Sequence, residues 1–188
     1  LWQRVLAHYP FLAQLGAPEQ ARLRELCSHF LAQKEFSGVG IAVTDDMALA
    51  VAAQACLPVL HLGASPAQAL DWYDDFVGIN IYPREMRARR HTEDEHGPSH
   101  TSTVDMTGKS AQEGYNVVIH EFAHKLDLRD GLADGCPPLP SRAARAHWQS
   151  SLQAHYATFC DAVQLAERFG ASPPFLDPYG AQSIDEFF

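Results

Sequence analysis

The chain has 188 residues, which is enough for one domain with a sizeable hydrophobic core. Hydrophobic residues make up 46% and charged residues 20%, and this balance excludes an intrinsically disordered chain. The net charge of −9 argues against a direct nucleic-acid partner, and no apolar run is long enough to cross a membrane. The four cysteines form no C-x-x-C pair, and their spacing in a chain of this length argues against a disulfide framework. No basic segment followed by an apolar one opens the sequence, so we expect a cytoplasmic protein.

Residues 1–35 are predicted to be helical. Apolar side chains recur there at helical spacing, and Pro18 fits the first turn of a helix. Residues 36–43, "FSGVGIAV", then predict a strand, in which the glycines mark weak points or close approach of another segment.

A nearly all-apolar helix is predicted next, capped by Thr44 or Asp45 and ended by Gly63. A helix that is apolar on every side belongs in the interior of a protein. Residues 74–83 alternate apolar and mixed positions, which predicts a second strand with one apolar face that includes Ile79 and Ile81.

Residues 84–114 lose all periodicity and predict a long polar loop, with a short strand near "TSTVDM". His96 and His100 have the spacing of metal ligands, but Gly97 and Pro98 between them exclude a helix. The sequence therefore favours a polar loop over an accessory metal site.

The second half predicts three further helices. The first spans residues 113–129, the second begins at Ser141 and runs to about residue 169, and the third begins at Ser183. Glu186, three residues after Ser183, can complete a capping box at the start of the last helix.

The helix over residues 113–129 contains the motif H-E-x-x-H, from His120 through Glu121 to His124. Residues four apart share one helix face, so both imidazoles can reach one Zn²⁺ ion at about 2.0–2.1 Å. Zinc lowers the pKa of its bound water to about 7, and the Glu121 carboxylate can then accept a proton from that water. An apolar flank, "NVVI", favours a buried metal site over a chance match on an exposed helix.

Asp127 lies on the same predicted helix face, three residues after His124. One reading makes it a hydrogen-bond partner that orients a zinc-bound histidine. The other makes it a helix-end carboxylate that binds nearby backbone N–H groups, and the sequence leaves both open.

A catalytic zinc site needs a third protein ligand. Asp130 lies six residues after His124, as in metzincins, but Asp127 occupies the position where that pattern has glycine. Glu167 and Glu186 are candidates from a second helix. Glu167 is more simply a solvated side chain, so Glu186 is favoured, with the capping box as its alternative role.

The sequence resembles the MtfA family of zinc-dependent peptidases. The stretches that carry the resemblance are "GYNVVIHEFAHKLD", "FLDPYGAQSIDEFF", "AAQACLPVLHLG" and "DWYDDFVGINIYP". The resemblance implies that His120, His124 and Glu186 are the zinc ligands, as in gluzincins, and that Glu121 is the catalytic base. It also places Tyr179, seven residues before Glu186 (186 − 7 = 179), at the site. A phenol there can stabilise the oxyanion or protonate the leaving amine.

We therefore expect an α+β fold: a mostly helical, zincin-like single domain over residues 1–188, with a small mixed β-sheet and an active-site helix. The segment between "ARR" and "GYN" is shorter than is usual in that family, and we expect the helix that carries Glu186 to continue in a longer protein. The expected activity is zinc-dependent hydrolysis of a peptide or protein substrate. The alternatives are a regulatory protein that sequesters a transcriptional repressor, with zinc structural, and a hydrolase of non-peptide amides or esters.

Overall fold

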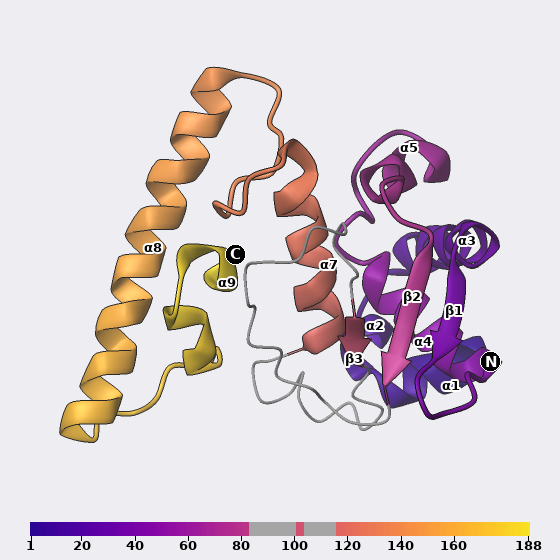
Figure 1. Ribbon diagram of the computed structural model, residues 1–188, viewed down its shortest axis with the longest axis horizontal. Coiled ribbons are helices and arrows are strands. Elements are labelled where there is room, and N and C mark those ends of the chain that lie inside the picture. Colours follow the sequence, from indigo (N-terminus) through magenta and orange to yellow (C-terminus); the bar gives the residue numbers. More distant parts are fainter. Residues whose placement is uncertain (83–100, 104–115) are drawn as a thin grey trace. The chain divides into compact units, whose positions relative to one another are not determined.

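The computed structural model describes residues 1–82, 101–103 and 116–188 (Figure 1). The chain forms two compact units, one of Leu1–Lys109 with Asn116–Glu121 and one of Ser110–Tyr115 with Phe122–Phe188. The boundary falls inside helix α7 (Val117–Asp127), which is continuous from one unit into the other. A single domain over residues 1–188 stays a prediction.

The described part of the first unit begins with helices, as the sequence predicts for residues 1–35. Pro18 lies in the first turn of the longest of them, and the side chains that face the core include Leu23, Leu26 and Phe30. The helices that precede the second strand are α1 (Trp2–His8), α2 (Pro10–Ala13), α3 (Ala17–Gln33), α4 (Asp45–Ala55), α5 (Pro66–Leu70) and the 3₁₀ turn η1 (Asp71–Tyr73).

Three strands form one sheet in the order β1 (Glu35–Gly38), β2 (Gly78–Tyr82) and β3 (Thr101–Thr103) (Figure 1). Phe36 pairs with Ile79, and Asn80 pairs with Thr101. Ile79 and Ile81 are buried, which confirms the apolar face predicted for β2. Both described strand pairs are parallel, so the prediction of a mixed sheet is wrong for the described strands. The path from β1 to β2 runs through α4 and α5, and such a crossover permits parallel pairing.

Two predicted boundaries in this unit are also wrong. The first strand ends at Gly38 instead of residue 43, because the chain turns back there: a Cβ atom on Gly38 would lie 2.0 Å from the Ile41 carbonyl oxygen. Helix α4 ends at Ala55 instead of Gly63. Pro58 explains this early end, because proline lacks the N–H that would continue the helix and clashes with the preceding turn.

Helix α4 is otherwise as predicted. The Thr44 side chain accepts a hydrogen bond from the Met47 backbone N–H at 3.3 Å and so caps the helix. Residues 50–55 of this helix are all buried, which confirms its interior position.

The motif helix α7 is anchored at its first turn by Asn116. The Asn116 Oδ1 atom accepts a hydrogen bond from the Ile119 N–H at 2.9 Å, and its Nδ2 atom donates to Gln54 Oε1 at 2.8 Å. Gln54 is buried on α4 and donates in turn to the Ala50 carbonyl. Asn116 thus caps α7, and the described helix begins at Val117, later than the predicted residue 113.

The second unit continues from α7 into the 3₁₀ turn η2 (Leu128–Asp130) and the 28-residue helix α8 (Arg142–Phe169). The helix begins next to Ser141, as the sequence predicts, and the Ser141 side chain caps it by accepting a hydrogen bond from the Ala144 N–H at 3.1 Å. The 3₁₀ turn η3 (Pro178–Ala181) and the short helix α9 (Ile184–Phe187) follow, and both pack beside α8 (Figure 1).

All four cysteines are free thiols, and Cys27 and Cys56 are buried, as expected. The strand predicted near "TSTVDM" is present as β3. His96 and His100 lie outside the described residues, so the accessory metal site stays a prediction. Among the helices that the structure describes, none has the length and apolar character needed to span a membrane.

Candidate metal centre

Helix α7 carries His120, Glu121 and His124 on one continuous 11-residue helix. The i, i+4 spacing places the two histidines on the same helix face, one turn apart. His124 is nearly inaccessible to solvent, with 2% of its surface exposed. A polar ring at such a position is costly unless it has polar partners.

Glu186 supplies such a partner from helix α9. Its Oε2 atom lies 3.3 Å from His124 Nε2, although the two residues are 62 positions apart in the chain. Both side chains are shielded from solvent, with exposed fractions of 2% for His124 and 9% for Glu186. Ser183 is the N-cap residue of α9, but no side-chain hydrogen bond caps this helix. The Glu186 carboxylate therefore faces the motif histidine.

His120, His124 and Glu186 form a group that can hold a metal ion: each offers one ligand atom, and these atoms lie within 4.8 Å of one another. Two ligands about 2.0–2.1 Å from a tetrahedral zinc ion are about 3.3–3.4 Å apart. The distance between His124 Nε2 and Glu186 Oε2, 3.3 Å, matches this distance between two zinc ligands. Two imidazoles and one carboxylate are also a donor set that catalytic zinc sites use. The residues present therefore fit zinc.

Tyr179 lies beside the same carboxylate. Its backbone N–H donates to Asp177 Oδ1 at 2.8 Å, which fixes the start of η3. Its phenol O–H donates to Glu186 Oε1 at 3.4 Å. The two carboxylate oxygens of Glu186 are therefore divided, one directed to His124 and the other to Tyr179.

Glu121 follows His120 directly on α7 and is half-buried. One residue further along an α-helix is a rotation of about 100°, so Glu121 lies beside the helix face that carries the two histidines and not on it. Glu121 is not one of the three residues in the metal-ligand group.

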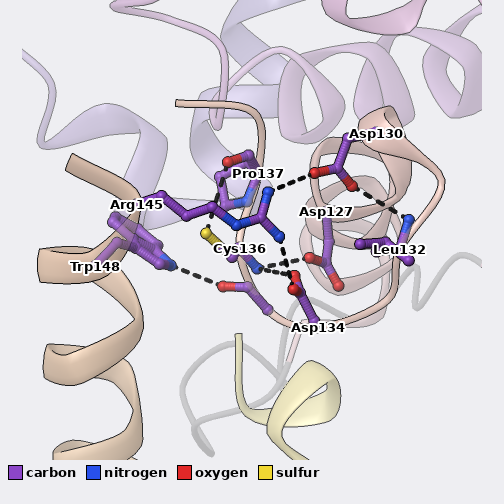
Figure 2. A network of polar contacts seen from close by, with 9 residues as sticks. Asp127, Asp130, Leu132, Asp134, Cys136, Pro137, Arg145 and Trp148 are labelled. Carbon is purple, nitrogen blue, oxygen red and sulfur yellow. Dashed lines mark hydrogen bonds and ion pairs between the residues drawn. The ribbon is translucent and has the colours of Figure 1, made fainter. Parts of the chain in front are cut away.

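Asp127 is fully buried, and its Oδ1 atom accepts a hydrogen bond from the Cys136 backbone N–H at 2.7 Å (Figure 2). Its Oδ2 atom has no hydrogen-bond partner among the described residues. Burial raises the pKa of this carboxyl, and the backbone N–H groups of residues 135 and 136 oppose that effect. The hydrogen bond from the Cys136 N–H is a backbone contact of the kind that the second role expects, and the orientation of a zinc-bound histidine by Asp127 stays a prediction.

The two other candidates for the third ligand lie elsewhere. Asp130 is exposed in η2, and its Oδ2 atom pairs with Arg145 Nη1 at 2.8 Å (Figure 2). The second terminal nitrogen of Arg145 pairs with Asp134 Oδ2, also at 2.8 Å. Glu167 is exposed on α8. Neither Asp130 nor Glu167 belongs to the ligand group found in the described part of the chain.

Asp130 gives a pH-dependent prediction. The hydrogen bond from Arg145 lowers the pKa of the Asp130 carboxyl below its ordinary value of about 3.9. A carboxyl whose pKa is lower in the folded protein than in the unfolded chain stabilises the fold at pH values above its unfolded-state pKa. This stabilisation is lost as the pH falls through the folded-state pKa. Asp130→Asn should therefore lower the Tm at neutral pH, and the difference from wild type should shrink as the pH falls below about 4.

Thermal unfolding followed by circular dichroism across this pH range checks the prediction. Asp161→Asn is the matched control, because Asp161 is exposed on α8 and has no ion pair among the described residues. A Tm difference for Asp130→Asn that stays constant with pH would contradict an ionic role for Asp130.

Several residues of this region carry no signal in the sequence. Gly135 and Cys136 belong to a turn-rich connector, "DGLADGCPPLP", whose composition predicts only irregular structure. Arg145 and Trp148 lie in the first part of α8, and their partners are the connector residues Asp134 and Gly135. Glycine and proline residues mark a turn, but they do not reveal what the turn contacts.

The model of one protein family, the glucose-regulated metallo-peptidase M90, matches residues 1–115 and 101–188. The two matches overlap at residues 101–115, most of which belong to the segment that is expected to be shorter than is usual in the MtfA family. An uncharacterized Synechocystis protein is 33% identical over 209 residues, which cover the whole chain and 72% of that protein. It therefore has at least 21 residues without a counterpart here (209 − 188 = 21).

Proteins named Mlc titration factor A are also similar. The one from Salmonella arizonae is 34% identical over the whole chain and 78% of its own length. The one from Klebsiella pneumoniae subsp. pneumoniae is 33% identical, again over the whole chain and 74% of its length. With matches that together span residues 1–188, and with two histidines and a glutamate grouped as metal ligands, the chain belongs to the glucose-regulated metallo-peptidase M90 family.

Proposed function

We propose that this chain is a zinc-dependent metallopeptidase that hydrolyses peptide bonds of a peptide or protein substrate. One observation carries the proposal: Glu186 Oε2 lies 3.3 Å from His124 Nε2, in a chain of a metallo-peptidase family. A carboxylate brought from 62 residues away to a motif histidine completes the three-ligand set of a catalytic zinc site.

His120, His124 and Glu186 would hold the ion. When bound, zinc acts as a Lewis acid on the substrate carbonyl and lowers the pKa of a coordinated water to about 7. Three protein ligands leave a coordination position open for chemistry, in contrast to the four ligands of a structural zinc site.

Glu121 is the general base of the proposed reaction. It neighbours His120 on α7 and is half-buried, so its carboxylate can lie beside the metal without being a ligand. It accepts a proton from the attacking water and then transfers it to the nitrogen of the leaving amine. General acid–base catalysis of this kind contributes about 10²- to 10⁴-fold to the rate.

Tyr179 supplies the second protein group that acts on the reacting atoms. Its phenol lies 3.4 Å from Glu186 Oε1, beside the proposed third ligand. A phenol O–H at this place can turn to donate a hydrogen bond to the developing oxyanion, or protonate the leaving amine. We place the activity in the cytoplasm, because four free thiols are typical of a reducing compartment.

Removal of the metal is the first test. A chelator should abolish hydrolysis of a peptide substrate, and stoichiometric Zn²⁺ should restore it, because only the loaded ligand set provides the Lewis acid. Mass spectrometry of the bound metal and a fluorogenic peptide assay measure both quantities. Hydrolysis that persists in the zinc-free protein contradicts the proposal, and activity restricted to ester substrates favours a non-peptide hydrolase.

A second candidate function comes from the name of the relatives, Mlc titration factor A. By this reading the chain sequesters a transcriptional repressor, and zinc has a structural role. The two functions differ in their dependence on the metal chemistry. A regulatory complex that survives chelation and the loss of Glu121 favours the second candidate, whereas zinc-dependent turnover favours the first.

A further inference from the structure

The position of Glu186 depends on what helix α9 contacts, because no side-chain hydrogen bond caps the start of this helix. One set of contacts comes from α8: Phe187 stacks on Phe159 with ring centroids 5.1 Å apart, and Phe188 meets Trp148 edge-on at 6.0 Å.

A second support for α9 comes from the backbone of Gly135. Gly135 has a φ of +72°, and a Cβ atom built on it would lie 3.1 Å from the Ile184 carbonyl oxygen and 3.5 Å from Phe188 Cβ. The same Cβ would lie 2.6 Å from a terminal methyl carbon of Leu152 on α8. Glycine therefore lets the connector lie directly against the first turn of the helix that carries Glu186.

Residues 134–136, which we name the Gly135 loop, are held from two sides. On one side, Asp127 accepts the Cys136 N–H at 2.7 Å, and Asp127 lies three residues after His124 on the motif helix. On the other side, Trp148 Nε1 donates to the Gly135 carbonyl oxygen at 2.7 Å (Figure 2). Arg145 adds an ion pair to Asp134.

These contacts connect the helices of two proposed ligands. They lead from His124 along α7 to Asp127, through the Gly135 loop to Ile184, and along α9 to Glu186. His124 and Glu186, the two ends of this series of contacts, also contact each other directly at 3.3 Å. A change in the Gly135 loop is therefore expected to shift α9 away from α7, and so to move Glu186 away from His124. The fixed spacing of residues along α7 does not prevent such a shift.

We propose that the Gly135 loop is the positioning element that sets the distance between His124 and Glu186 and so preorganises the metal site. This inference rests on the proposed function, because it takes Glu186 to be the third zinc ligand. Residues that orient metal ligands from outside the ligand set typically change metal affinity by about 10- to 100-fold when they are mutated. Asp127, Gly135 and Trp148 are assigned this role here, and none of them belongs to the ligand group of His120, His124 and Glu186.

The test compares Gly135→Ala with Gly131→Ala. Both glycines have left-handed backbone, with φ of +72° and +86°, so alanine strains the backbone at both positions. The Cβ at Gly131 meets nothing within 4 Å, whereas the Cβ at Gly135 meets the first turn of α9 and Leu152. The dissociation constant for Zn²⁺, measured by competition with a chelating dye, should rise by at least about 10-fold in Gly135→Ala and stay at the wild-type value in Gly131→Ala.

Hydrogen exchange of the zinc-free protein is the second readout. The backbone N–H groups of Phe187 and Phe188 donate to residues 183 and 184 at 3.2 Å. They should exchange faster in Gly135→Ala than in Gly131→Ala, because α9 loses its close contact with residue 135. If Gly135→Ala does not fold, Trp148→Phe replaces it in both measurements. This variant removes the hydrogen bond to the Gly135 carbonyl but keeps an aromatic ring against Phe188. Trp2→Phe is its control.

Equal zinc affinity and equal exchange in the two glycine variants would overturn the inference and leave α8 as the support of α9. That result does not touch the proposed function, which fails separately if the zinc-loaded wild type hydrolyses no peptide. A wild type without hydrolysis, combined with weakened zinc binding in Gly135→Ala only, would support the positioning role and refute the peptidase.

Discussion

Replacing Glu121 with glutamine should lower kcat for peptide hydrolysis by about 100- to 10,000-fold while zinc stays bound. Glutamine has nearly the shape of glutamate but cannot accept a proton, so the variant removes the general base and little else. Glu121 is outside the ligand group of His120, His124 and Glu186, and metal binding should therefore persist. Steady-state kinetics with a peptide substrate and a metal determination on the same sample measure the two effects.

Glu167→Gln is the matched control for this change, because Glu167 is an exposed glutamate on α8 and receives the same chemical substitution. Its kcat should equal that of the wild type. Unchanged turnover in Glu121→Gln would refute the proposed mechanism. A repressor complex that forms equally well with wild type and Glu121→Gln, without measurable turnover in either, would support the regulatory function instead.

Replacing Glu186 with alanine should weaken zinc binding by more than about 100-fold. The reason is that Glu186 is proposed as a direct ligand, and even supporting residues outside the ligand set cost about 10- to 100-fold. The loss should exceed that of Gly135→Ala, which leaves the carboxylate present but displaced. Zinc competition with a chelating dye measures the affinity, and circular dichroism checks that the helices remain.

Glu167→Ala and Asp130→Ala are the informative comparisons, because the sequence offers both residues as alternative third ligands. Glu167→Ala should bind zinc like the wild type, since its side chain is exposed on α8. Asp130→Ala loses its pair with Arg145 and should affect stability more than metal binding. Wild-type zinc affinity in Glu186→Ala, with a large loss in Asp130→Ala, would identify Asp130 as the ligand.

Local signals in the sequence predicted most of the helices. The sequence offers Thr44 or Asp45 as the cap of α4 and places the start of α8 at Ser141. The Thr44 and Ser141 side chains both accept the backbone hydrogen bond that defines an N-cap. The errors occur where one residue changes the course of the chain. Gly38 ends β1 through a close backbone approach, and Pro58 follows the early end of α4. A periodicity averaged over many residues does not register such single positions.

The sheet shows a different limit. Alternation in residues 74–83 predicted β2 and its buried face correctly, but it contains no information about the direction of neighbouring strands. Strand direction depends on the connections, and the helical crossover between β1 and β2 permits the parallel pairing that the structure shows. The apolar pattern alone is equally compatible with a mixed sheet.

The sequence by itself determined the motif helix and the relation of His120 to His124, because residues four apart on a helix are neighbours whatever the rest of the protein does. It reduced the candidates for the third ligand to a few acidic residues, and both their sequence surroundings and the family resemblance favoured Glu186 among them. Only the tertiary structure decided what each of these carboxylates contacts. Glu186 lies at His124, Asp130 pairs with Arg145, and Asp127 binds the Cys136 backbone. The physical reason is that the meeting of α7 and α9 depends on packing between segments 62 residues apart. No local periodicity predicts that packing. In this protein it consists of the contact of Phe159 on α8 with Phe187 and of the close approach of Gly135 to Ile184.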